Sequence, residues 1–279
     1  MATTSPSEPV GKVGFIGLGD MGGGMVTRII QAGWPTVLWA RRPESIEEFD
    51  GPGVTVAATP AALAAEVDLV GVCVWADDDV RDVVAGDTGV LAGCRPGTVI
   101  AVHSSVAPAT CRELADMAAA RGVALLDAPV SGGRQVALDG ALTVAVGGDD
   151  AALARCRPVF ESFASTIVHL GGVGAGQAAK LVNNALFAAN LALADDALAL
   201  GEELGIDAAA LAEFVRVGSG RSYALDVALR ARASAEMRQA ARPALEKDLM
   251  SLNAEVGSDR EAGAVLRDTA SDGVDRLSR

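Results

Sequence analysis

One ammonium and two carboxamides are expected on a single helix face in the run Gly174-Ala-Gly-Gln-Ala-Ala-Lys-Leu-Val-Asn-Asn184. Residues three and four apart are neighbours on a helix, so Lys180, Asn183 and Asn184 can converge on one ligand. Almost all residues around them are small or apolar, and a lysine in such surroundings lies beside a core or a cleft. An amine placed there can exchange a proton with an alcohol or carbonyl oxygen. The alternative is a lysine that lays its stem along the surface and keeps its tip in water.

A second stretch suited to chemistry is Asp127-Ala-Pro-Val-Ser131-Gly132-Gly133. Two successive glycines expose backbone N–H groups to an anion, and the Ser131 hydroxyl adds a donor. A ligand that bears a carboxylate would suit such a loop. The same residues are equally consistent with a plain loop that follows a strand.

A glycine-rich turn near the amino terminus has the spacing G-x-G-x-x-G, after an expected strand and before an expected helix over Gly23 to Ala32. In such a turn Gly17 permits the tight bend, Gly19 lets a pyrophosphate approach the backbone, and Gly22 lets the helix press on the strand. Backbone N–H groups and the positive helix end would then hold the phosphates. We therefore predict a dinucleotide site that includes Gly17, Leu18, Gly19, Asp20, Met21 and Gly22.

Two arginines follow the second expected strand, in Trp39-Ala-Arg41-Arg42-Pro43. An enzyme that uses NAD usually has an acidic residue there, which binds the ribose 2′-hydroxyl. Two guanidinium groups instead suit a 2′-phosphate, through bidentate charge-assisted bonds and stacking on adenine. NADP is therefore favoured as the cofactor, with NAD as the alternative. The other interpretation is a pair of solvated loop arginines.

The elements expected around these residues change type along the chain. Short apolar runs alternate with amphipathic segments up to about His169, which predicts an α/β fold: a Rossmann-type, doubly wound parallel sheet covered by helices. After Gly174 the sequence is Ala/Leu-rich with helical periodicity, which predicts an all-α domain. We expect a disordered tail over residues 1–11, a dinucleotide-binding domain over 12–172 and a helical substrate and dimerisation domain over 173–279. The expected strands are Val13 to Ile16, Thr36 to Trp39, Leu69 to Val74, Thr98 to Val102, Ala124 to Leu126, Leu142 to Val146 and Thr166 to His169.

The helical domain should begin with a long helix from Ala175 to about Glu203 that is apolar on nearly every side. A helix packed on one domain alone does not need this, so we expect a subunit interface, in a homodimer or homotetramer. Breaks between helices are expected at Gly205 to Asp207, at Gly218 to Gly220 and at Pro243.

Composition narrows the classes of partner. The 279 residues carry a formal charge of −13 and no Lys/Arg-rich run, which argues against nucleic acid or an anionic membrane surface. The amino-terminal residues lack the pattern of a secretory signal, and no apolar stretch is of membrane-spanning length, so we expect a cytoplasmic protein. The four cysteines are widely spaced without paired histidines, so no metal site is expected.

Four motifs stand in order along the chain: the glycine turn up to Gly22, Asp127 to Gly133, Gly174 to Asn184, and Lys247-Asp248-Leu249. Together they resemble the β-hydroxyacid dehydrogenase family, which includes 3-hydroxyisobutyrate dehydrogenase, tartronate semialdehyde reductase and the glyoxylate/succinic semialdehyde reductases. The similarity covers the chain from Val13 to about Leu266. It implies an NAD(P)-dependent oxidoreductase that acts on a small carboxylate or aldehyde.

The resemblance also implies roles for residues that match the family's motifs. Lys180 would be the catalytic acid/base, and Asn184 would fix the substrate and the ammonium. The Ser-Gly-Gly motif would bind the substrate carboxylate, while Lys247 and Asp248 would border the active site. Two strand ends would contact the cofactor. The residues implied to bind the substrate carboxylate are Ser131, Gly132 and Gly133. The residues implied to contact the cofactor are Val74, Trp75, Ala76, Ser104 and Ser105.

Three other functions are consistent with parts of the sequence. Imine reductases share the architecture but generally have Asp or Tyr in place of Lys180, and relatives of 6-phosphogluconate dehydrogenase are generally longer. A noncatalytic NADPH-binding sensor would keep the first motif and lose the others. Family members usually continue beyond the last helix expected here, which affects the outer wall of the substrate pocket. His103 is expected to be structural. Tyr223 is expected to pack in the ordinary way, with a place in the wall of the substrate pocket as the alternative.

Overall fold

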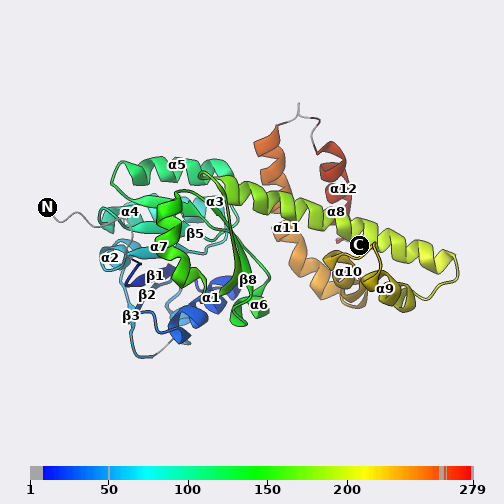
Figure 1. Ribbon diagram of the computed structural model, residues 1–279, viewed down its shortest axis with the longest axis horizontal. Coiled ribbons are helices and arrows are strands. Elements are labelled where there is room, and N and C mark those ends of the chain that lie inside the picture. Colours follow the sequence, from blue (N-terminus) through cyan, green and yellow to red (C-terminus); the bar gives the residue numbers. More distant parts are fainter. Residues whose placement is uncertain (1–8, 50, 258–260, 262, 278–279) are drawn as a thin grey trace. The chain divides into compact units, whose positions relative to one another are not determined.

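The computed structural model describes residues 9–49, 51–257, 261 and 263–277 (Figure 1). The chain divides into two compact units, Met1–Lys180 and Leu181–Arg279. Residues 1–8 of the expected disordered tail lie outside the described residues. Val10 is 2% exposed, and its N–H donates to the Arg155 carbonyl at 3.3 Å, so ordered contacts reach at least this far towards the amino terminus.

The first unit is built on one sheet. Its described strands are β1 (Val13–Ile16), β2 (Thr36–Trp39), β3 (Val54–Val56), β4 (Leu69–Val72), β5 (Val99–Val102), β6 (Ala124–Asp127), β7 (Val130–Ser131), β8 (Leu142–Gly147) and β9 (Ala164–Gly171). The order is β3-β2-β1-β4-β5-β6-β8-β7, with β9 paired to β8. From β3 to β6 neighbouring strands are parallel. The Rossmann-type expectation is confirmed for this part of the sheet.

Beyond β6 the sheet reverses its direction. Strand β8 is antiparallel to β6 and β7, and parallel to β9. The sheet is therefore mostly parallel rather than wholly parallel. Strands β3 and β7 were not expected from the sequence, because runs of three and two residues are too short to show an alternating pattern.

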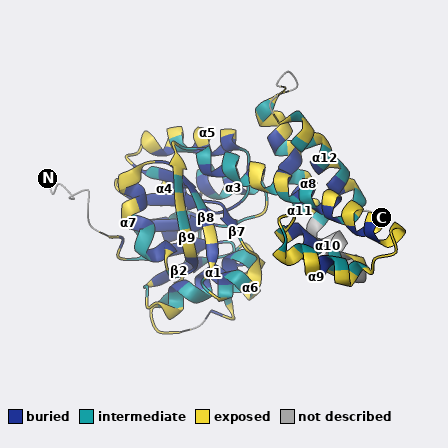
Figure 2. Ribbon diagram, turned by 45° about the vertical axis from the view of Figure 1, so that its right-hand side comes forward, coloured by how far each residue is buried: buried dark blue, intermediate teal, exposed yellow. Residues whose placement is uncertain are grey.

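Helices cover both faces of this sheet. They are α1 (Asp20–Gln31), η1 (Pro43–Ile46), α2 (Pro60–Ala65), α3 (Asp77–Ala85), α4 (Val90–Gly93), α5 (Pro108–Ala119), α6 (Arg134–Leu138) and α7 (Asp150–Phe160). Successive strand residues point to opposite faces, so Phe15 joins one core cluster with Met25 of α1, while Ile16 joins a second with Leu114 of α5. The two clusters explain why the central strands β1, β4 and β5 are buried throughout. Figure 2 shows the dark blue of buried residues inside this unit and yellow on the helices around it.

The second unit is helical within the described residues. It contains most of α8 (Ala175–Glu203), with α9 (Ala208–Val217), α10 (Tyr223–Ala233), α11 (Ala235–Val256) and α12 (Ala264–Arg276). Leu198, Leu245 and Ala270 belong to its core cluster. The breaks expected at Gly205 to Asp207 and at Gly218 to Gly220 are confirmed. No helix within the described residues is long and apolar enough to span a membrane.

The break expected at Pro243 is wrong, because α11 runs through this residue. A proline inside a helix removes one backbone hydrogen bond and crowds the preceding turn. Leu245, Leu249 and Leu252 follow it on α11 and are all at most 9% exposed in the helical core. Burial of these side chains offsets the local cost of the proline, and the helix continues.

Candidate functional site

Two glycines of the turn between β1 and α1 have no space for a side chain. Gly17 has φ +93°, and a Cβ there would lie 2.1 Å from the Cys73 carbonyl oxygen. A Cβ on Gly22 would lie 1.8 Å from the Gly17 carbonyl oxygen. Both contacts are with backbone atoms, so neither position can carry a side chain without moving the chain. The fold itself requires these two glycines.

Gly19 differs from both. Its φ is −73°, which any residue can adopt, and no atom lies within 4 Å of a Cβ built on it. It is the N-cap of α1, and no side chain caps the amides there. Strand β1 has β2 on one side and β4 on the other, so the turn lies at a switch point of the sheet, where ligands bind in open α/β folds. The space beside Gly19 and the uncapped amides are features that could hold an anion.

Arg41 and Arg42 follow β2, and both are exposed. The Arg41 guanidinium lies 3.1 Å from a carboxylate oxygen of Asp79 on α3, and its side chain is 83% exposed. Because the pair is open to solvent, it constrains Arg41 only weakly. Arg41 is therefore accessible to an anionic group.

A side-chain hydrogen bond links two of the residues expected to contact the cofactor. The Val74 N–H donates to the Ser104 hydroxyl oxygen at 2.8 Å, which joins the segments after β4 and β5. Ser104 is 3% exposed, whereas Trp75 is 63% exposed. Ala76 is the N-cap of α3, again without a side-chain cap, and Ser105 is half-buried.

The Ser-Gly-Gly segment lies between β7 and α6. Gly132 and Gly133 have φ of +146° and +88°, and a Cβ on Gly133 would meet no atom within 4 Å. Ser131 ends β7, and Arg134 begins α6. The Arg134 guanidinium lies 3.2 Å from a carboxylate oxygen of Asp20, in the first turn of α1. The tertiary structure therefore brings this segment next to the glycine turn.

A buried carboxylate holds the start of α8. Asp127, at the end of β6, is fully buried and accepts hydrogen bonds from the N–H groups of Gly174 at 2.7 Å and Gln177 at 2.8 Å. Burial raises the pKa of the Asp127 carboxyl above its ordinary value, and the backbone N–H donors oppose that rise. The carboxylate also lies at the positive end of the helix, where a negative charge is favourable.

The Gln177 side chain is also fully buried. Its amide nitrogen donates to the Ser104 carbonyl at 2.7 Å, and its oxygen accepts from the Val106 N–H at 3.1 Å. The first turn of α8 is thus tied to the segment after β5. Asp127 and Gln177 both lie in motifs that the sequence singled out, but no role was predicted for either. A carboxylate directly after an apolar strand was the only signal for Asp127.

Four predicted site residues lie on two helices: Lys180 and Asn184 on α8, and Lys247 and Asp248 on α11. Lys180 is the last residue of the first unit, and Asn184 stands one helical turn later on α8. The Asn184 amide donates to a carboxylate oxygen of Asp248 at 2.6 Å, and the Asn183 amide donates to the Asn184 oxygen at 3.1 Å. Lys247 Nζ lies 3.8 Å from the other oxygen of Asp248. These bonds orient the Asn184 carboxamide.

His103 is a core residue. It is 3% exposed, stacks on Phe15 with ring centroids 6.0 Å apart, and meets the edges of Phe160 and Phe163. Its Nδ1 lies 2.8 Å from the Ala128 carbonyl and must donate there, because a carbonyl only accepts. Burial lowers the pKa of His103 to about 4. The ring is therefore neutral at physiological pH and serves the packing.

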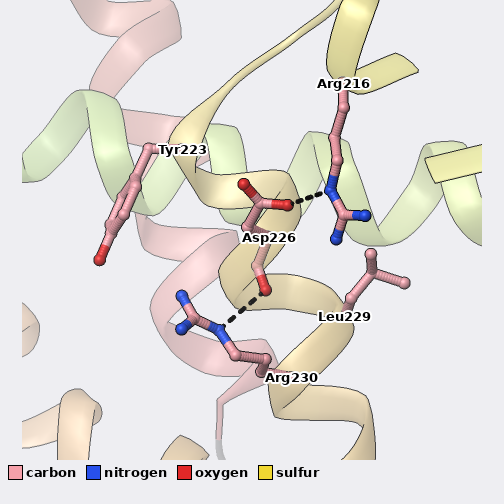
Figure 3. Close-up of a pocket in the computed structure, with 5 residues that line it drawn as sticks. All are labelled: Arg216, Tyr223, Asp226, Leu229 and Arg230. Atoms are coloured by element: carbon pink, nitrogen blue, oxygen red, sulfur yellow. Dashed lines mark hydrogen bonds and ion pairs between the residues drawn. The ribbon is translucent and has the colours of Figure 1, made fainter. Parts of the chain in front are cut away.

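Tyr223 borders a shallow hollow of about 430 Å³ in the helical unit (Figure 3). It is 68% exposed, and its ring contacts Phe187 at a centroid distance of 5.9 Å. In Figure 3 Asp226 points to Arg216, with which it forms a 2.6 Å ion pair, while the Arg230 Nε donates to the Asp226 carbonyl. None of the residues predicted for catalysis or cofactor binding lines this hollow.

Two family models match most of the chain. Residues 12–171 match the NAD-binding domain of 6-phosphogluconate dehydrogenase. Residues 174–271 match the NAD-binding domain of NADP-dependent 3-hydroxyisobutyrate dehydrogenase.

Relatives and solved structures agree with these matches. The NAD-dependent L-serine dehydrogenase of Pseudomonas aeruginosa is 38% identical over 216 residues, which are 77% of this chain and 72% of that protein. The Mycobacterium tuberculosis 3-hydroxyisobutyrate dehydrogenase with L-serine is 29% identical, with a TM-score of 0.80 over 96% of this chain and 92% of that one. Psf3 in complex with NADP⁺ and 2-OPP is 28% identical, with a TM-score of 0.82 over 95% and 93% of the two chains.

Proposed function

Since this chain belongs to the β-hydroxyacid dehydrogenase family, we propose that it transfers a hydride between NADP(H) and a small 3-hydroxy acid, or reduces the corresponding semialdehyde. The observation that carries the proposal is the glycine turn. Its two outer glycines are required by the fold, whereas Gly19 leaves open space beside uncapped amides. A pyrophosphate is the group that suits this space.

The class of substrate follows from the chemistry of the relatives' substrates. L-Serine and 3-hydroxyisobutyrate both carry an alcohol one carbon removed from the carbon that bears the carboxylate. In this chain Ser131, Gly132 and Gly133 would hold the carboxylate through the hydroxyl and the backbone N–H groups. The open space beside Gly133 supports this role.

Lys180 would act as the general acid and base. A bound nicotinamide would supply the hydride acceptor for oxidation of the alcohol and the hydride donor for reduction of the carbonyl. In oxidation the hydroxyl proton passes to the Lys180 amine, and in reduction the Lys180 ammonium returns it to the oxygen. The Asn184 carboxamide, held by Asp248 at 2.6 Å, would orient the same oxygen without adding charge.

An activity screen tests the proposal. Wild-type protein is given L-serine or 3-hydroxyisobutyrate with NADP⁺ or NAD⁺, and short aldehydes or imines with NADPH, and the nicotinamide absorbance is followed. We expect oxidation of a 3-hydroxy acid and a higher kcat/KM with NADP⁺. Reduction of imines alone would support the imine reductase alternative, and tight NADPH binding without turnover would support the sensor.

The Lys180→Ala variant tests the mechanism within that screen. Turnover should fall roughly 10²- to 10⁴-fold while NADPH binding stays nearly unchanged. Lys12→Ala is the matched control, because Lys12 pairs at the surface with Glu66 at 2.9 Å. Wild-type turnover in Lys180→Ala would remove the acid/base assignment.

A homodimer, or a tetramer of two dimers, is part of the same proposal. Leu186, Leu193 and Leu200 on α8 are 52%, 57% and 57% exposed, and they recur at intervals of seven residues. A seven-residue spacing keeps side chains on one helix face, as in packed helix pairs. Sedimentation should therefore show a dimer or tetramer that Leu193→Glu dissociates. Val265→Glu, at an exposed apolar residue of α12, should leave the assembly intact. The cytoplasmic location stays a prediction.

A further inference from the structure

We infer that Gln177 is a positioning residue, whose buried carboxamide locks Lys180 to the segment that follows β5. The inference rests on the proposed function, because it assigns the part that Gln177 plays in placing the proposed acid/base. Every residue it uses belongs to the first unit.

The Gln177 carboxamide bridges two parts of the chain that are more than seventy residues apart. It donates to the Ser104 carbonyl at 2.7 Å and accepts from the Val106 N–H at 3.1 Å. Ser104 in turn accepts from the Val74 N–H at 2.8 Å through its hydroxyl oxygen. One continuous set of hydrogen bonds therefore joins both predicted cofactor segments to the first turn of α8.

The same residue is fixed from the backbone side. The Gln177 N–H donates to Asp127 at 2.8 Å, and the Gly174 N–H donates to the other oxygen of that carboxylate at 2.7 Å. Gly147 and Gly176 make room for this carboxylate, because a Cβ on either would lie within 2.9 Å of an Asp127 oxygen. The two backbone hydrogen bonds thus tie the first turn of α8 to the end of β6.

Lys180 follows Gln177 by three residues, and residues at this spacing share a helix face. A small rotation or shift of the first turn would therefore carry the Lys180 amine with it. Proton transfer needs its partners within hydrogen-bond reach, and misplacement by about 1 Å can lower a rate by about 10²-fold. A buried carboxamide whose polar atoms are all bonded resists such a shift, since breaking those bonds leaves polar groups without partners.

A double-mutant cycle tests the inference. Gln177→Met keeps the length of the side chain and removes both hydrogen bonds. With L-serine or 3-hydroxyisobutyrate and NADP⁺, we expect kcat to fall by about 10-fold or more, and the KM for NADP⁺ to change by less than about 3-fold. In a Lys180→Ala background the same substitution should cost less than about 2-fold, because a residue that acts through Lys180 has nothing left to position.

Thr36→Val is the matched control. Thr36 is fully buried and its hydroxyl donates to the Trp34 carbonyl at 2.8 Å, at the opposite end of β2 from Arg41. This variant should lose stability as Gln177→Met does, yet keep the wild-type kcat. An unchanged kcat in Gln177→Met, or equal losses with and without Lys180, would overturn the inference. Should Gln177→Met fail to fold, Gln177→Glu keeps the acceptor for Val106 and enters the same cycle.

Hydrogen exchange separates this inference from the proposed function. In Gln177→Met the amides of Val106 and of the first turn of α8 should exchange faster together, and in Thr36→Val neither should. If Lys180→Ala keeps wild-type turnover, or no 3-hydroxy acid is oxidised, the proposed function fails while exchange still decides whether the bridge exists. Unchanged exchange at either segment would remove the bridge itself, whatever the activity.

Discussion

Helices α1 and α8 both begin in the first unit directly after a glycine turn, and the backbone amides of their first turns differ in their partners. At the start of α1 no side chain caps the amides, and the space beside Gly19 is open. At the start of α8 the amides of Gly174 and Gln177 are bonded to the buried carboxylate of Asp127. A helix start that the protein leaves uncapped can take a ligand's negative charge, whereas one that it caps becomes a rigid support.

The difference comes from which residue the fold places opposite each turn. Both turns contain glycines with positive φ, Gly17 before α1 and Gly174 before α8. Strand β6 ends in an aspartate that faces α8, while β1 and β4 bring backbone and apolar atoms to α1. Two glycine turns therefore lead to an uncapped helix start in one place and to a capped one in the other.

The largest expected effect is the difference in stability between alanine variants of Gly22 and Gly19, two glycines of the turn before α1. Gly22→Ala forces a Cβ to within 1.8 Å of a backbone oxygen, so it should lower the free energy of unfolding by about 3 kcal/mol or more. Gly19→Ala meets no atom and should cost less than about 1 kcal/mol. Its Kd for NADPH should nevertheless rise by about 10-fold or more, because the methyl group occupies the phosphate's space. Urea unfolding and fluorescence titration measure the two quantities. Unchanged NADPH affinity in Gly19→Ala would mean that α1 does not hold the cofactor.

The next prediction tests the start of α8, where two backbone amides donate to Asp127. Asp127→Asn replaces one acceptor oxygen by an NH₂ group that faces a backbone N–H, so we expect a loss of about 3 kcal/mol in the free energy of unfolding. Asp68→Asn is the control, since the backbone amides of Gly11 and Lys12 both donate to one oxygen of the partly exposed Asp68, and an asparagine keeps one such oxygen. It should cost less than about 1 kcal/mol. Similar losses in both variants would show that the second accepting oxygen of the buried Asp127 carboxylate adds nothing.

The dependence of stability on pH in the acid range tests the contribution of the core residue His103. In the folded protein the pKa of His103 is lowered to about 4, whereas in the unfolded chain it is about 6.5. Between these two values the unfolded chain binds a proton at His103 and the folded protein does not. Stability should therefore fall by about 3 kcal/mol as the pH drops from about 6.5 to 4, and this part of the loss should be absent in His103→Phe. At pH 7 the variant should be less stable by about 1 kcal/mol, because the Ala128 carbonyl loses its donor. Parallel stability profiles for both proteins across this range would contradict the assignment.

The smallest expected effect concerns Arg41, which follows β2 and for which the sequence predicts a 2′-phosphate contact. Asp79 holds the Arg41 guanidinium at 3.1 Å and would compete with a 2′-phosphate for it. Asp79→Asn should raise the ratio of kcat/KM for NADP⁺ over NAD⁺ by about 2- to 5-fold, in keeping with the low strength of exposed ion pairs. Asp78→Asn is the control, because Asp78 pairs with Arg81 instead. A ratio that falls in Asp79→Asn would mean that Asp79 orients Arg41 for the phosphate.

Much of the fold was visible in the sequence because its signals are local. Buried parallel strands give continuous apolar runs, and Gly205 and Gly218 mark real helix ends. The predicted helix break at Pro243 is wrong, because packing of α11 on the helical core outweighs a single missing hydrogen bond. The reversal at β8 was not visible either, since strand direction depends on the path of the chain between strands.

The candidate site divides in the same way. The sequence by itself determined that a glycine turn, a lysine with two asparagines, and a Ser-Gly-Gly segment are present, because each is a contiguous motif with its own chemistry. Only the tertiary structure decided that Gln177 reaches Ser104, that Asp127 caps α8 and that Asp248 orients Asn184. These partners are at least 47 residues apart. Hydrogen bonds between such distant residues depend on how strands and helices pack, and no spacing along the chain encodes that packing.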